Sequence, residues 1–289
     1  MDEPSPRQSR LALAAIVCAL LLVGGGSFLL GLSAANRSPI EPASVPATVD
    51  QQQTKPQSLE PSVLSRVDLL KLAAAGADAA AGVPQSDEQL ARLEKRRFEI
   101  RLPFGCNGPD QSDQPQVSGN GWRYDEPSSS LRIYISPVVW TGEDWTPPAF
   151  PQKVETVEGF WIERPWSSSE VCPRDVSATG ATATENTVAV GQIFTTESSR
   201  SGRRNNQPYN AVIPTPKDEL DVSRGLLIRL RGRLAGAAVN SAHCRTPLSP
   251  KVRPVCLVQV SIDEVAVENA ATGETLATWD PAGASITTG

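Results

Sequence analysis

The sequence predicts a mainly β domain, an antiparallel sandwich or partly open barrel, that is exported and carried on a membrane anchor. Three observations lead to this prediction. Residues 11–35 form a long apolar stretch without charge. Residues 36–62 are rich in Pro, Ser and Gln. From residue 97 onward, apolar side chains recur with a period of two, as in half-buried strands.

The stretch 11–35 is long enough to cross a bilayer, whose apolar core needs about 20 residues of helix. A cleaved signal peptide is the alternative, because the small residues 33–35 would suit a cleavage site. Signal peptides carry a shorter apolar region of about 7–15 residues, so the length favours an uncleaved transmembrane helix. Cys18 lies within this helix as a small apolar filler.

The flanking charges predict the orientation of this helix. Arg7 and Arg10 precede it, whereas Arg37 and the more distant Lys55 follow it. The positive-inside rule then places tail 1–10 in the cytoplasm and the rest of the chain outside it. Arginine outnumbers lysine and alanine is abundant, which suggests a bacterial source. In a Gram-negative cell the anchor would lie in the inner membrane and the domain in the periplasm.

Residues 36–62 have too few large apolar side chains to fold, so we expect a disordered linker. Short helices follow in 63–96. In the first, Leu64, Val67, Leu70 and Ala74 share one helical face. It could dock on the domain, but the pattern favours a marginal helix within the stalk. The second is expected to begin at Ser86, which acidic residues follow, and to end near Arg96.

Strands are predicted from residue 97 onward. In 97–104, Phe98, Ile100 and Leu102 face one way and the charged residues between them face the other. Residues 122–136 read as a hairpin, in which Trp122 and Tyr124 lie opposite an aliphatic strand across a polar loop. The aliphatic partners are Leu131, Ile133 and Ile135.

Three more segments of strand complete the predicted domain, 97–282, and a flexible tail, 283–289, follows it. The first is 188–195, and the second is 225–234, with Ile228 and Leu230 pointing inward. The last is a long strand with a turn and a return strand in 257–279, and its change of parity predicts a bulge near Asp263 and Glu264.

Arginines occupy the outward face of strand 225–234, at positions 229, 231 and 233. Arg229 and Arg231 either present a basic surface to an anionic partner or pair with acidic residues on neighbouring strands. The acidic candidates are Glu99, Asp263 and Glu268. Arg203 and Arg204 lie in the loop 200–206, which either grips an anion or forms a solvated tip, the interpretation that we favour.

Four of the five cysteines belong to the exported part, and an even number in an oxidising compartment predicts two disulfides. Three pairings exist. Closeness in sequence favours Cys244–Cys256, which leaves Cys106–Cys172. His243 is the only histidine, and it adjoins Cys244. The sequence has no G-x-S-x-G, H-E-x-x-H or paired C-x-x-C motif. We therefore expect no metal, no cofactor and no catalytic role for His243.

Five of the six tryptophans fall between residues 122 and 166. Trp140 and Trp145 bracket residues 141–144 and lead into the polar, Pro-rich loop 146–153, which makes them the best candidates for stacking on a glycan. Glu143 and Asp144, between them, are candidates for an acid–base pair, although adjacent carboxylates on a loop usually face solvent.

These observations favour a non-enzymatic role, in binding or scaffolding within the cell envelope, with an envelope protein as partner. The alternative is a cell-wall or glycan-binding module that uses the exposed tryptophans. A carboxylate-dependent envelope hydrolase ranks third. The net charge of −5 argues against nucleic acid as a partner.

Overall fold

The computed structural model of the protein describes residues 63–83, 93, 95–110, 119–141, 153–163, 168–172, 186–198, 200–235, 242–245, 254–281 and 283–288. These residues belong to one compact unit that begins at Leu59. The expected membrane helix, the linker and most of the second short helix lie outside the described residues. No helix in the described part of the chain is long and apolar enough to span a membrane.

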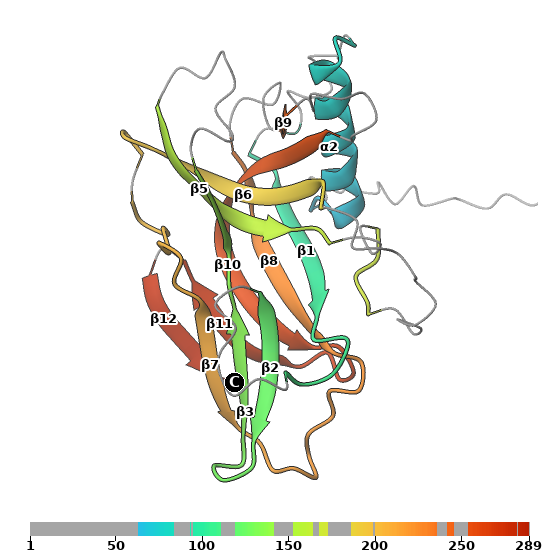
Figure 1. Ribbon diagram of the computed structural model, residues 1–289, viewed down its shortest axis with the longest axis vertical. Helices are drawn as coiled ribbons and strands as arrows, with labels where there is room; N and C mark the ends of the chain where they lie inside the picture. Colours follow the sequence, from blue (N-terminus) through green and yellow to red (C-terminus); the bar gives the residue numbers. More distant parts are fainter. Residues whose placement is uncertain are drawn as a thin grey trace, which may run out of the picture. The chain divides into compact units, whose positions relative to one another are not determined.

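The unit contains one described helix and twelve strands, shown in Figure 1. Their bounds are α2 Arg66–Ala80, β1 Arg97–Phe104, β2 Asn120–Asp125, β3 Ser130–Ile135, β4 Val138–Thr141, β5 Val154–Trp161, β6 Val188–Thr195, β7 Tyr209–Pro214, β8 Leu226–Leu234, β9 Ala242–Arg245, β10 Val255–Asn269, β11 Thr275–Asp280 and β12 Gly283–Thr288.

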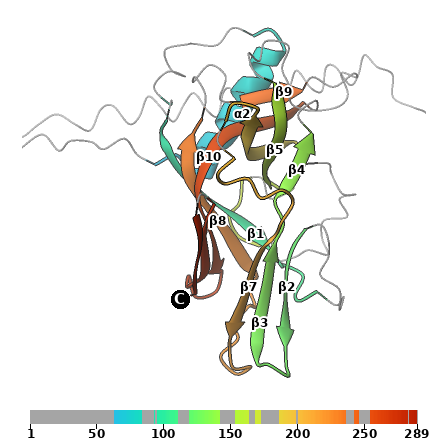
Figure 2. The ribbon, with the colours of Figure 1, turned by 90° about the vertical axis from the view of Figure 1, so that its left-hand side faces the viewer.

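The strands form two sheets. The larger has nine strands, with the order β1-β8-β10-β6-β5-β4 and with β9, β11 and β12 attached through β10. The smaller is the antiparallel set β2-β3-β7, which lies at the end of the unit far from α2 (Figure 2). β10 and β6 run parallel, so the larger sheet is mixed rather than purely antiparallel as expected. Neither sheet closes into a barrel over the described strands.

One apolar core joins the two sheets and the helix. It combines Phe98 and Ile100 of β1 with Trp122 of β2, Ile133 of β3 and Leu69 of α2. The period-two pattern therefore identified the buried faces of β1 and of the β2–β3 hairpin correctly. In that hairpin Trp122 pairs with Ile133, and Tyr124 with Leu131, as the sequence predicts.

The predicted bulge is present in β10. Its pairing with β8 shifts between Ile262 and Glu264, so that Ile262, Val265 and Val267 are all buried despite their mixed spacing. Residues 283–289 were expected to form a flexible tail. Instead, Gly283–Thr288 forms β12, which pairs antiparallel with β11.

Helix α2 docks on the domain, which corrects the expectation of a marginal stalk helix. Ser65 and Asp68 form a capping box at its start. Leu69 and Leu72 are buried in the core, whereas Val67, assigned to the apolar face from the sequence, is 49% exposed. Leu64, assigned to the same helical face, precedes the helix, which begins at Arg66. Leu64 instead forms a parallel bridge with Phe98 of β1.

This bridge covers the outer edge of β1. The Leu64 amide donates to the Arg97 carbonyl over 2.8 Å, and the Glu99 amide donates to the Leu64 carbonyl over 3.0 Å. Further along the same strand, the Arg66 guanidinium donates to the Arg101 carbonyl over 2.5 Å. The chain that enters the domain thereby satisfies an edge that would otherwise be open to another strand.

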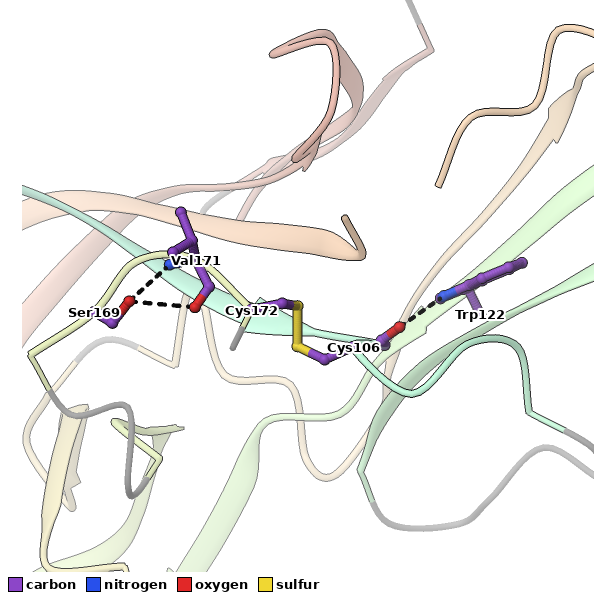
Figure 3. Close-up of a disulfide and its surroundings, with 6 residues drawn as sticks. Cys106, Trp122, Ser169, Val171 and Cys172 are labelled. Carbon is purple, nitrogen blue, oxygen red and sulfur yellow. Dashed lines mark hydrogen bonds between the residues drawn. A yellow bond between two sulfur atoms is a disulfide. The ribbon is translucent and has the colours of Figure 1, made fainter. Parts of the chain in front are cut away.

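Both disulfides have the pairing that the sequence favoured, Cys106–Cys172 and Cys244–Cys256. Figure 3 shows the first, which lies just beyond the end of β1, beside Trp122. The indole of Trp122 donates to the backbone carbonyl that precedes Cys106 in the chain, over 3.5 Å (Figure 3).

Candidate functional site

The large sheet divides into two branches along β10. On one side of this strand, β6 pairs as far as Gln259, and β11 begins to pair at Val265. Among the described strands, none pairs with 260–264 on that side. Figure 1 shows β10 running from the group of β5, β6 and β9 to the group of β11 and β12. We call the open interval between β6 and β11 the fork.

An open groove of about 480 Å³ lies at the fork. β6 and the loop after it contribute Gln192, Ile193, Phe194, Ser198, Ser201 and Gly202, and the remaining lining comes from Ala235, 259–263 and Asp280. Its lining thus mixes apolar side chains with amides, hydroxyls and two carboxylates, and no lysine or arginine of the described chain lines it. Such a surface suits a polar, extended ligand better than a compact apolar one.

At the fork, side chains form hydrogen bonds with backbone amides that would otherwise bond to a neighbouring strand. The Ile262 amide donates to the Oε1 atom of Gln192 over 2.5 Å. The Thr195 amide, at the end of β6, donates to the Ser198 hydroxyl over 2.8 Å. Both strand edges are therefore capped by side chains that could rotate away to admit another backbone.

A small recess of about 10 Å³, which is room for about one water molecule, adjoins the groove, because Gln192, Gly202 and Ile262 line both. Glu158 of β5 lines the recess and is only 5% exposed. Its carboxylate accepts hydrogen bonds from the backbone amides of Arg204, over 2.6 Å, and Asn205, over 2.9 Å.

The loop 200–206 therefore binds the carboxylate of Glu158, which belongs to the same chain. Arg203 adds ion pairs to Glu155 at 3.0 Å and Glu158 at 3.9 Å. The Arg204 guanidinium stacks 4.4 Å from the ring centre of Tyr209 and does not reach into solvent as a loop tip would. The solvated tip that we favoured is wrong for these two residues, because the buried Glu158 draws the loop onto β5.

Tyr209 is buried under this loop, next to Trp279 of β11, with a ring-centre separation of 5.5 Å. Burial raises the pKa of its phenol to about 12, against a weaker lowering by Arg204. The phenol therefore stays neutral at physiological pH and contributes apolar area to the recess.

The arginines of β8 are paired with acidic residues. Arg229 contacts Glu268, and also Glu264 at 3.0 Å. Arg231 contacts Glu99 at 2.7 Å, and Arg233 contacts Asp263 at 3.5 Å. The three acidic partners expected from the sequence are confirmed, and Glu264 is an additional one. These pairs neutralise the stripe, which weakens the case for a basic docking surface.

Trp140 lies on β4 rather than in a loop. Its ring packs edge-on against Trp161 of β5, with centres 5.1 Å apart, and both rings are half-buried. They border a second apolar cluster that includes Val157 and Leu257. Trp145, Glu143 and Asp144 lie outside the described residues. Of the two tryptophans expected to be exposed, only Trp140 can therefore be located.

His243 lies on β9 and is 9% exposed. Its Nε2 atom and the Oε1 atom of Gln259 lie 2.9 Å apart, and burial lowers the imidazole pKa despite this hydrogen bond. Its neighbour Cys244 is in a disulfide, so it offers no thiol for a Cys–His pair. The described residues contain no group of three or more metal-ligating side chains.

The fork is not predictable from the local sequence pattern. Strand β5 was not predicted, because its residues 154–161 (VETVEGFW) alternate only in part between apolar and polar. Without β5, its pairing with β6, which continues beyond the contact of β6 with β10, could not be predicted either. Searches against protein families, curated proteins and solved structures gave no match to this chain.

Proposed function

We propose that this protein is a single-pass inner-membrane protein whose periplasmic domain binds an extended segment of an envelope partner in the groove at the fork. The role is non-enzymatic binding or scaffolding. The observation that carries the proposal is the fork itself, because on the side of β10 away from β8 the interval 260–264 lies beside a groove and not beside a described strand. Two disulfides in a β domain support an oxidising, extracytoplasmic location.

Strand addition is the binding mode that this groove favours. An extended peptide gains affinity from backbone hydrogen bonds to a strand edge and specificity from alternate side chains. The Gln192 amide holds the place of a backbone carbonyl at Ile262, so an incoming strand would displace one side chain and not a folded element. The polar lining described above then contacts the side chains of the peptide.

A photocrosslinking amino acid at Ser261, which is exposed in the groove, tests this proposal in intact cells. We expect crosslinks to a defined envelope protein, at adjacent residues of one extended segment. The matched control is Asn210, an exposed residue on the smaller sheet. Equal crosslinking from both positions, or none from Ser261, would contradict a binding site at the fork.

The location has its own test. A C-terminal fusion to alkaline phosphatase should be active and a C-terminal fusion to green fluorescent protein should be dark, because the C-terminal domain is proposed to be periplasmic. The opposite pair of results would place the domain in the cytoplasm.

A cell-wall glycan is the second candidate ligand, favoured by the half-buried Trp140–Trp161 pair. Aromatic rings at a surface can stack on sugar faces. Sedimentation with isolated peptidoglycan should then retain the wild-type protein and lose Trp140→Ala. Failure of the wild type to sediment would exclude this ligand and leave the groove proposal unaffected.

A further inference from the structure

The Cys244–Cys256 disulfide lies directly beneath α2. The sulfur of Cys244 is 3.7 Å from the carbonyl oxygen of Ala73, in the middle of the helix. Cys256 is 2% exposed and Cys244 is half-buried. A thiolate must approach one of the two sulfurs closely to attack a disulfide, so the helix restricts access to this bond.

Gly76 lets the helix approach so closely. A Cβ atom at this position would lie 2.8 Å from the Cβ of Ala242 and 3.1 Å from the sulfur of Cys244. Glycine inside a helix costs about 1 kcal/mol relative to alanine. Here it serves contact between α2 and β9, because the backbone of Gly76 is not in the left-handed region. Leu72 and Ala73, one turn earlier, are buried on the same interface.

β9, which carries Cys244, is a short strand. It pairs with β10 through the four residues Ala242–Arg245, and the disulfide joins the register partners Cys244 and Cys256. The helix therefore packs on a strand that the disulfide holds in place. The two features are thermodynamically linked. A change that detaches α2 from β9 also exposes the disulfide, and breaking the disulfide weakens the packing of α2 on β9.

We propose that Cys244–Cys256 is a thiol-exchange site covered by α2, with a dithiol reductant as its reagent. One thiolate of the reductant attacks the less buried sulfur, that of Cys244. The Cys244–Cys256 bond breaks, a mixed disulfide forms, and the Cys256 thiolate takes up a proton. The second thiol of the reductant then attacks the mixed disulfide and releases Cys244 as a thiol. Overall, two electrons and two protons pass to the protein, and the reductant becomes a disulfide.

The position of α2 in the chain allows the preceding segment to influence access to the Cys244–Cys256 disulfide. The helix begins at Arg66, directly after the segment 36–62 that is expected to connect the domain to its anchor. Leu64, which bridges to β1, lies between this segment and the helix, so displacement of the entering chain acts on the edge of β1 and on α2 together. Cys106–Cys172, beyond the far end of β1, packs against Gly225 instead and serves as an internal reference.

The test is the reduction rate of each disulfide in the full-length protein in detergent micelles, with dithiothreitol as the dithiol. Alkylation of new thiols and mass spectrometry follow the two bonds separately. Gly76→Leu, which forces α2 off β9, should accelerate reduction of Cys244–Cys256 at least tenfold and leave Cys106–Cys172 unchanged. Ala74→Leu, on the exposed face of the same helix, should change neither rate. Equal rates for Cys244–Cys256 in all three proteins would overturn the proposal.

A second measurement keeps the proposal testable if Gly76→Leu does not fold. Amide hydrogen exchange of residues 66–80 in the wild-type protein is compared before and after reduction. We expect at least tenfold faster exchange once Cys244–Cys256 is open. Unchanged protection of the helix would show that the disulfide and α2 are not coupled. Neither result depends on a ligand at the fork.

Discussion

At the scale of single residues, Arg229 and Glu268 form a buried pair of opposite charges. The side chains of Arg229 and Glu268 are 11% and 8% exposed and contact each other directly. Arg101 of β1 adds a second contact to Glu268, at 2.7 Å. A charge removed from water at this depth is tolerated only with such partners, so each member of the set depends on the others.

Glu268→Ala should destabilise the domain strongly. It leaves the buried Arg229 with fewer anionic contacts, a change that costs about 3 kcal/mol in comparable buried pairs. Urea unfolding measures the effect. The matched control is Glu126→Ala, which removes an exposed ion pair with Lys217 and should leave the unfolding midpoint unchanged. Similar midpoints for both variants would show that burial adds nothing to the Arg229 pair.

Tyr209 makes the stability of the domain fall in alkaline solution. Its pKa is raised by burial to about 12 in the folded protein, from 10.0 for a free phenol. The unfolded chain then loses its proton first, so this contribution to stability is complete below pH 10 and is lost as the pH rises through 12. Unfolding curves at pH 9 and 11.5 should therefore differ less in Tyr209→Phe than in the wild type. An unchanged difference would contradict the assignment.

At the scale of elements, the loop 200–206 is held by one side chain. Gly202, Asn205 and Asn206 all have positive φ, which helps to turn successive backbone amides toward Glu158. The sequence reveals the arginines and the turn-forming residues but not their target, because Glu158 lies more than forty positions away in β5.

Glu158→Ala should release this loop. Trypsin needs a local stretch of mobile chain, so cleavage after Arg203 or Arg204 should become at least tenfold faster. Glu155→Ala is the matched control, because it removes a carboxylate from the same strand and an ion pair from Arg203 but leaves both backbone amides of the loop bound. If the two variants are cleaved equally fast, the backbone contacts do not hold the loop.

Sequence periodicity predicted the elements whose two faces differ. β1 and the β2–β3 hairpin were predicted because apolar and polar residues alternate along most of their length. Helix α2 was predicted as a helix, but its buried face was not, because alanines occupy both sides and differ little in apolar character. Its docking depends on tight approach at Gly76, which carries no hydrophobic signal.

At the scale of the whole molecule, the fork arises from pairings between distant segments. β6 joins β10 through only four register pairs, Cys256–Gln259 with Val188–Gly191, and then follows β5 away from it. No local pattern encodes this parallel contact, since the paired residues Val188–Val190 and Leu257–Val258 are apolar like those of the other buried strands. The sequence could therefore predict the sheet-rich class and the disulfides, whereas the candidate site depends on the topology.

The two disulfides should contribute unequally to the stability of the domain. Cys106–Cys172 joins residues 66 positions apart and Cys244–Cys256 joins residues 12 apart. In the chain-entropy picture, the longer loop is worth about 4 kcal/mol and the shorter about 3 kcal/mol. Denaturant unfolding of the full-length protein, with each cysteine pair replaced by serine, measures both.

Removal of the two disulfides should also destabilise different parts of the domain. Cys106→Ser with Cys172→Ser should lower protection across the sheets while α2 stays docked, because this bridge packs against Gly225 and adjoins Gly105, whose carbonyl accepts the hydrogen bond from Trp122. Cys244→Ser with Cys256→Ser should cost less overall and expose α2 first, because β9 is the seat of the helix. A larger overall loss from the shorter loop would mean that contacts with α2, and not loop entropy, dominate the contribution of that disulfide.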